Sequence, residues 1–270
     1  MKKFDIEPSR ALSMEQFLKE ISQIEAPRFS DDYIAQSARL LKEFANNENI
    51  IWDYLNPSIL EKWEETFAAP QSFVMGFSDD VTIRANIWVP SKVGSFTIHE
   101  DELYAYGLAH NHDFRLLTVG FYGPGYETDL YRFEDERKEI PEGEAVELKD
   151  HRRERLTKGS VWLYEQYSDV HIQRGPSDLS ISINIIYRNE EKERDQILFD
   201  VEKSRTIGPV RYSLNSRLIT AMEMADQLGN RQTMPLLENL KQSHGFDRVK
   251  AMAAKTLASM QRVSSDLADG

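Results

Sequence analysis

The sequence predicts a mainly β fold, a barrel or sandwich of short strands with α-helices at both ends. Apolar residues recur at helical spacing over residues 11–68, the period changes to two from about residue 71, and helical spacing returns after Pro209. These changes of period predict an N-terminal helical segment over 1–70, a β core over 71–210 and a C-terminal helical segment over 211–270.

The N-terminal helices are predicted from capping signals. Ser13 stands three residues before Gln16, the spacing of a capping box, and apolar residues follow at helical spacing. Ser30 begins a second apolar stripe. Ser58 and Glu61 form another capping box directly after Pro57, so we expect a third helix to begin there.

The β core is predicted from runs rich in β-branched and aromatic residues that Gly and Pro turn signals separate. These runs cover residues 73–77, 81–89, 116–122, 161–164 and 179–187. Many short strands at such spacing are typical of a β-barrel or β-sandwich. After the core, three helices are expected over residues 214–228, 231–242 and 246–262.

Composition excludes several classes of function. The 33 Lys and Arg against 45 Asp and Glu give a net charge of −12, which disfavours nucleic acid and anionic membranes as partners. The absence of cysteine removes disulfides, Cys-type zinc sites and thiol nucleophiles. No apolar run approaches the roughly 18 residues of a membrane span, and no apolar stretch follows the basic N-terminus. We therefore expect a soluble, cytoplasmic protein.

Two of the six histidines form the pattern His110-Asn111-His112. Side chains i and i+2 of a strand point to the same face, so both imidazoles can share one metal inside a barrel. His171 lies between two strand-like runs and is the leading candidate for the third ligand.

The surroundings of these histidines resemble the two-motif layout of the cupin superfamily, over roughly residues 75–190. The resemblance is strongest to the thiol-dioxygenase branch that includes cysteine dioxygenase. It implies a cupin-type β-barrel, also called a double-stranded β-helix, with a three-histidine metal site, and it suggests a homodimer that pairs through the barrels. The residues that carry it are Gly107 to His112, Gly159, His171, Pro176 and the run 180–187.

The sequence departs from that branch in three ways. In many cupins a glutamate follows the His-x-His pair, and the nearest candidate here is Glu127. Glu127 would be either a fourth metal ligand or a carboxylate in a turn, and we favour the turn. Asn184 stands where the branch has a relay histidine, and Ile186 stands where it has a tyrosine. A Cys–Tyr crosslink is impossible without cysteine. Oxidation of free cysteine is therefore disfavoured.

Three neutral imidazoles leave a metal its full charge and leave coordination positions open to substrate and O₂, as related non-haem iron sites do. We therefore predict an Fe(II) oxygenase or dioxygenase that acts on a small-molecule substrate with O₂, although imidazole also suits Ni, Mn, Cu and Zn. Tyr126 and Asn184 are candidate catalytic residues. Further candidates to line the pocket are Arg84, Tyr122 and Trp162.

Two alternatives stay open. His99 and Asp101, with a distal His151 or His171, match the ligand pattern of 2-oxoglutarate-dependent oxygenases, and Arg174 or Arg188 would then hold the 2-oxoglutarate carboxylate. The second alternative is a cupin without catalytic activity. It would bind a small molecule or metal and dock a partner protein through its helices. The remaining histidines fit structural roles without catalysis: His151 lies in a solvated charged loop, and His244 caps a helix end.

Overall fold

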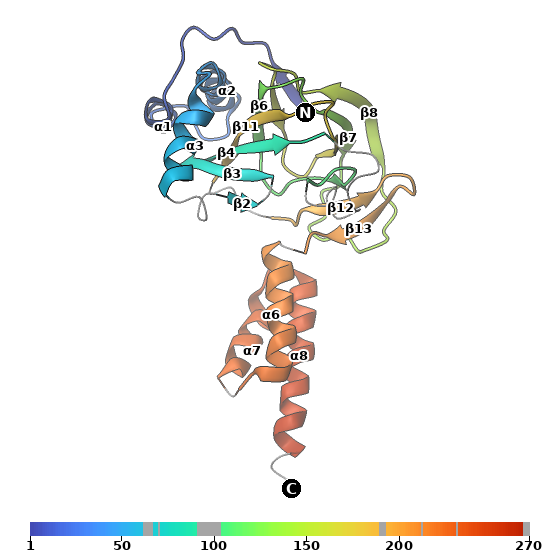
Figure 1. The fold of residues 1–270 in the computed structure, drawn as a ribbon. Helices are drawn as coiled ribbons and strands as arrows, with labels where there is room; N and C mark the ends of the chain where they lie inside the picture. The colour runs from blue at the N-terminus through green and yellow to red at the C-terminus, as the bar shows by residue number, and fades with distance from the viewer. Residues whose placement is uncertain are drawn as a thin grey trace. The chain divides into compact units, whose positions relative to one another are not determined.

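A computed structural model describes residues 1–61, 67–69, 71–90, 104–188, 193–211, 213–230 and 232–266 (Figure 1). The chain divides into two compact units, which are described separately. The first unit comprises Met1–Glu134 and Glu147–Lys192, and the second comprises Asp135–Val146 and Glu193–Gly270. Within the described ranges, no helix has the length and apolar character needed to cross a membrane. The domain boundaries predicted at residues 70 and 210 stay predictions.

The first two helices begin at the residues that the capping signals predict. Helix α1 (Met14–Ser22) has a complete capping box, in which the Ser13 hydroxyl accepts the Gln16 N–H at 3.2 Å and the Gln16 side chain accepts the Ser13 N–H at 2.9 Å. Helix α2 (Asp31–Ala45) is capped by Ser30, whose hydroxyl accepts the Tyr33 N–H at 3.1 Å. Each cap satisfies N–H groups that the first helical turn leaves without partners.

The prediction that a third helix begins near Ser58 is wrong. Helix α3 spans Ile50–Glu61. Ile50 and Ile51 are only 3% and 4% exposed, and Tyr54 and Leu55, one turn later, pack against the same core. The apolar stripe that drives this helix onto the core therefore begins well before the capping signal.

The larger sheet of the first unit is antiparallel and has the strand order β1-β9-β6-β11-β4-β3-β2. Its longest ladder pairs β11 with β4 in register from Ser180 opposite Trp88 to Tyr187 opposite Val81. The predicted strands of this sheet are confirmed to within about a residue. The bounds are β1 Lys2–Phe4, β2 Phe67–Ala69, β3 Ser72–Phe77, β4 Val81–Trp88, β6 Leu116–Tyr122, β9 Val161–Tyr164 and β11 Ser180–Tyr187.

A second antiparallel sheet in this unit contains the strands β5-β10-β7-β8 in that order. From β4 to β11 the chain passes back and forth between the two sheets, which is the connectivity of a double-stranded β-helix. The predicted fold class, a cupin-type barrel flanked by helices, is confirmed. The bounds are β5 Ala109–His110, β7 Glu127–Phe133, β8 Leu148–Arg155 and β10 Asp169–Arg174.

Strand β8 contradicts the prediction of a solvated loop around His151. The segment is exposed, as expected, but it forms a ladder with β7. Backbone hydrogen bonds to β7 hold the strand while its charged side chains stay in water, and the Arg153 guanidinium pairs with Asp129 at 2.8 Å. Periodicity missed this strand because it carries almost no apolar residues.

The two faces of the larger sheet differ in chemistry, and this difference positions the site. Ile183 and Ile185 of β11 belong to a hydrophobic core that also contains Phe17, Leu41 and Phe44 of α1 and α2. Figure 1 shows these helices beside the sheet that contains β4 and β11. The alternate residues of β11, among them Ser182 and Asn184, point to the barrel interior and are 1% and 2% exposed. The main hydrophobic core therefore lies outside the barrel, and the interior combines polar side chains with a smaller aromatic cluster.

The second unit combines the hairpin of β12 (Ile197–Asp200) and β13 (Arg205–Pro209) with three helices. The helices are α6 (Leu214–Leu228), α7 (Thr233–Ser243) and α8 (Asp247–Asp266), close to the predicted ranges. Their shared core is built from apolar residues at helical spacing. It contains Met222, Leu237, Val249, Ala253 and Leu257.

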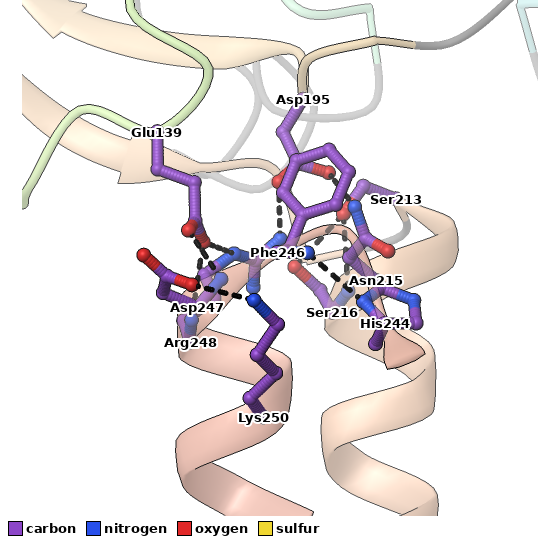
Figure 2. Close-up of polar contacts among 10 residues, drawn as sticks. All are labelled: Glu139, Asp195, Ser213, Asn215, Ser216, His244, Phe246, Asp247, Arg248 and Lys250. Carbon is purple, nitrogen blue, oxygen red and sulfur yellow. Dashed lines mark hydrogen bonds and ion pairs between the residues drawn. The ribbon is translucent and has the colours of Figure 1, made fainter. Parts of the chain in front are cut away.

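Carboxylates fix the first turns of α6 and α8, as Figure 2 shows. Glu139 accepts the backbone N–H groups of Asp247 and Arg248 at 2.5 and 3.2 Å, so it caps α8 from a different segment. Asp195 pairs with the Arg248 guanidinium and accepts the Asn215 amide of α6 at 3.0 Å. A negative side chain at a helix N-terminus is favourable because the helix dipole is positive there.

Candidate metal centre

The two halves of the histidine pattern reach the barrel interior from neighbouring strands. His110 is the last residue of β5, and His171 lies directly opposite it on β10. His112 comes two residues after the strand has ended, so the prediction that one strand carries both His110 and His112 is wrong. The chain nevertheless turns the His112 ring toward the same place.

The three rings form a compact triangle. Ring centroids lie 5.0 Å apart for His110 and His112, 4.4 Å for His110 and His171, and 4.8 Å for His112 and His171. One nitrogen from each ring lies within 4.8 Å of the others. Their exposed fractions are 6%, 9% and 0% for His110, His112 and His171. The three predicted ligands are therefore brought together in the protein interior.

The backbone fixes the direction of the His110 ring. Nδ1 of His110 lies 2.9 Å from the carbonyl oxygen of Leu108, an acceptor that assigns the proton to Nδ1. Nε2 is then the lone-pair nitrogen, and it faces Nε2 of His171 at 3.1 Å. Metal-binding histidines commonly donate their second N–H to a carbonyl in this way.

Burial favours the neutral form of His110 and His171, the form that a metal requires. It lowers the pKa of His110, against a smaller opposing effect of the Leu108 carbonyl. The pKa of His171 lies well below its ordinary value because the ring is buried and because His110 and His112 would place like charges beside it. A neutral imidazole can bind a metal without first losing a proton.

The spacing fits a metal ion. Metal–nitrogen bonds of ~2.1 Å at right angles separate two ligand nitrogens by about 3.0 Å, close to the 3.1 Å between Nε2 of His110 and Nε2 of His171. The same spacing also allows Nε2–H of His171 to donate a hydrogen bond to Nε2 of His110, and a metal ion would replace that proton. The donor set and its spacing therefore suit a divalent ion such as Fe(II), Ni, Mn, Cu or Zn.

Aromatic rings pack around the imidazoles. Phe114 stacks on His112 at 4.6 Å, and the Tyr164 ring lies 4.7 Å from His171. Tyr164 is the last residue of β9. The alternate side chains Trp162 and Tyr164 of this strand are 2% and 1% exposed. These rings limit the movement of the imidazoles and exclude water from one side of the triangle.

The two candidate catalytic residues both lie in the barrel interior. Tyr126 is 3% exposed and stacks on Trp88 with ring centroids 4.0 Å apart. Burial raises the pKa of the Tyr126 phenol, so it is a neutral hydrogen-bonding group at physiological pH. Asn184 donates its amide to the Asn86 side chain and to the Arg84 carbonyl, each at 3.3 Å.

The pocket candidates have different surroundings. Trp162 lies in the interior cluster with Tyr126 and Tyr164. Arg84 lies opposite Asn184 on the neighbouring strand. Tyr122, in contrast, is 54% exposed and lines a cavity on the helix side of the sheet.

Glu127 has a strand position, so the prediction of a turn is wrong. It begins β7, and its carboxylate accepts a hydrogen bond from Arg155 at 2.6 Å. The group of potential metal-binding side chains found among the described residues does not include Glu127. Its role as a fourth ligand stays a prediction.

The structure describes two of the three rival histidines, His151 and His244. His99 and Asp101 lie outside the described residues. His151 contacts Asp129 at 3.2 Å and stacks on Tyr131 at the exposed strand β8. His244 ends α7, and its Nδ1 accepts the Phe246 N–H at 3.2 Å. This contact makes His244 part of the α7–α8 turn.

One interior residue close to the histidines was overlooked in the sequence. Gln173 follows His171 by two positions on β10, so both side chains share the inner face. It is 7% exposed, and the described residues offer no hydrogen-bond partner to its side-chain oxygen. The period of two that places His171 inside the barrel could have identified it.

Comparisons with solved structures find cupin-type domains. A cupin domain from Bordetella pertussis is 14% identical, matches 45% of this chain and 98% of its own, and has a TM-score of 0.26. A hydroquinone 1,2-dioxygenase from Sphingomonas is 9% identical over 48% of this chain and 72% of its own, with a TM-score of 0.31. The DMSP lyase DddQ from Ruegeria pomeroyi is 10% identical over 73% of this chain and 81% of its own, also with a TM-score of 0.31. No protein-family model and no curated protein matches the sequence. The fold assignment rests on the strand connectivity described above.

Proposed function

We propose that the protein is a metal-dependent enzyme in which His110, His112 and His171 hold one divalent ion. The observation that carries this proposal is the 3.1 Å approach of the His110 and His171 Nε2 atoms in the barrel interior. The hydrogen bond of His110 to Leu108 supports it, because it leaves Nε2 free to bind.

We propose Fe(II) as the ion and O₂ as the second substrate. Fe(II) held by three neutral ligands supplies open positions at which a small molecule and O₂ react together. The thiol-dioxygenase resemblance includes the three histidines but not the relay residues on β11. Because Asn184 replaces the relay histidine of that branch, a substrate other than free cysteine is proposed.

The barrel interior supplies groups that orient a polar small molecule. Asn184 presents an amide from β11, Tyr126 presents a neutral phenol, and Gln173 presents an amide beside His171. None of these groups carries a charge at neutral pH. Their proposed role is to position substrate by hydrogen bonds, while the surrounding aromatic rings exclude water from the site.

The test combines metal analysis with oxygen uptake. Protein purified without a histidine tag and loaded anaerobically with Fe(II) should hold about one iron per chain and should consume O₂ when a substrate is added from a small-molecule panel. His171→Ala should lose both properties. Wild-type protein that holds the metal and consumes no O₂ with any compound would favour the alternative, a binding protein without catalytic activity. Wild-type protein that holds no metal would overturn the proposal.

A further inference from the structure

A second cavity lies in the first unit, on the helix side of the larger sheet. It has a volume of about 660 Å³ and is lined by α2, α3 and the strands β4, β6 and β11. Ile51, Phe121 and Ile181 form part of its wall. We refer to it as the outer pocket. Its volume lies in the range of about 300–1,000 Å³ that is typical of small-molecule sites.

The outer pocket is separate from the histidines because the sheet lies between them. Ile181 of β11 faces the helices and packs against the hydrophobic core formed by α1, α2 and the sheet. The next residue, Ser182, points into the barrel, where its hydroxyl accepts the Trp88 indole N–H at 3.0 Å. The sheet therefore presents the outer pocket and the metal centre on opposite faces.

The walls of the outer pocket are apolar and only partly covered. Ile51 and Phe121 are 4% and 8% exposed, as in a normal core, but large side chains around them reach solvent. Trp52 is 60% exposed, Tyr122 54% and Leu179 41%. Protein cores are usually packed without voids of this size, and exposed apolar patches beside a cavity mark binding sites.

One end of the outer pocket carries charged side chains. Lys158 and Glu48 line it and form an ion pair at 3.4 Å. Among the described residues that line the outer pocket, Lys158 is the one cation and Glu48 the one carboxylate. The Lys158–Glu48 pair is largely exposed and therefore weak, so another carboxylate can replace Glu48.

We propose that the outer pocket binds an amphipathic carboxylate, with its alkyl chain between α3 and the sheet and its head group at Lys158. The apolar walls match an alkyl chain, and the Lys158 ammonium, whose exposed pair with Glu48 is weak, matches a single negative head group. This proposal is independent of the metal centre.

The experiment is calorimetric titration of the whole chain with octanoate, decanoate and dodecanoate, each below its micelle concentration. Dodecanoate should bind at about one molecule per chain. Affinity should rise by about fourfold per added methylene, which corresponds to burial of each CH₂ group. His110→Ala should bind dodecanoate as wild type does, because the histidines lie on the other face. Loss of binding in His110→Ala would assign the carboxylate to the metal centre and overturn the proposal.

Matched variants locate the ligand. Ala45→Trp fills the outer pocket from α2 and should weaken dodecanoate binding by at least tenfold, whereas Ala35→Trp, at an exposed position of the same helix, should not. Lys158→Met should weaken dodecanoate by about threefold to tenfold and leave dodecanol unchanged. Lys203→Met, another ion-paired surface lysine, is its control. Equal binding by Ala45→Trp and wild type, or no saturable binding by wild type, would overturn the proposal.

Discussion

His110 and His171 stand directly opposite each other on the antiparallel strands β5 and β10, and their Nε2 atoms lie 3.1 Å apart. The register of β5 with β10 places the two residues opposite each other, so both rings enter the barrel interior side by side. The two nitrogens can share a proton in a hydrogen bond, or a metal ion can take the place of that proton and bind both. The register of two strands therefore prepares the centre for a metal.

Metal content should respond to each of the three histidines. His110→Ala, His112→Ala and His171→Ala should each reduce metal from about one ion per chain to near zero, since even changes around a ligand cost ~10–100-fold in affinity. Elemental analysis measures this, and circular dichroism reports whether the fold survives.

The control variants are His151→Ala and His244→Ala, whose side chains contact Asp129 and the Phe246 backbone. Both should retain the metal. Full occupancy in His171→Ala would contradict the three-histidine site. Loss of metal in His99→Ala with retention in His110→Ala would favour the 2-oxoglutarate alternative.

Tyr126→Phe and Asn184→Ala should separate substrate positioning from metal binding. Tyr126→Phe keeps the stacking on Trp88 and removes only the hydroxyl, and Asn184→Ala removes an amide held by Asn86. Both variants should hold wild-type amounts of metal. Substrate-dependent oxygen uptake should fall by about tenfold to a hundredfold in kcat/KM, the scale of a misplaced substrate. Unchanged kinetics in both variants would remove these residues from the site.

Asp129→Asn should destabilise the barrel at neutral pH. Burial alone would raise the pKa of Asp129, but hydrogen bonds from Arg153, Arg174 and His151 outweigh it and hold the pKa at about 2. Because the folded pKa is depressed, the carboxylate stabilises the fold above its unfolded pKa of ~3.9, and this contribution disappears as pH falls toward 2.

Urea unfolding should therefore show Asp129→Asn to be less stable than wild type by roughly 2–3 kcal/mol at pH 7, the scale for losing charged hydrogen bonds. The difference should shrink between pH 4 and pH 2. Asp150→Asn, a change at an exposed position of β8, is the control. A difference that is constant with pH would show that the Asp129 charge does not act in this way.

Glu139→Gln should weaken the second unit. The Glu139 carboxylate accepts the first backbone N–H groups of α8, and loss of its charge should lower stability by about 1 kcal/mol, as for other helix caps. Differential scanning calorimetry of the whole chain measures the effect. Glu136→Gln, at an exposed position of the same segment, should leave the transition unchanged. Equal effects of the two substitutions would contradict the capping role of Glu139.

The sequence by itself determined the elements whose physics is local. Capping at Ser13 and Ser30, the apolar alternation of β4, β6 and β11, and the helical spacing of α6 and α8 each depend on residues within a few positions of one another. The His-x-His pattern likewise identified His110 and His112 without a structure. Strand β8 and the start of α3 were predicted wrongly because tertiary pairing and packing decided them against the local signals.

Only the tertiary structure decided how distant residues meet. The register of β5 with β10 sets the approach of His110 and His171, which are 61 positions apart in the chain. The helices cover the face of the larger sheet that holds Ile183 with apolar side chains and leave the face that holds Asn184 to the barrel interior. Alternation alone could not tell which of these two faces turns to the interior. A period of two divides the residues of a strand into two faces, and only long-range packing assigns those faces to the site or to the core.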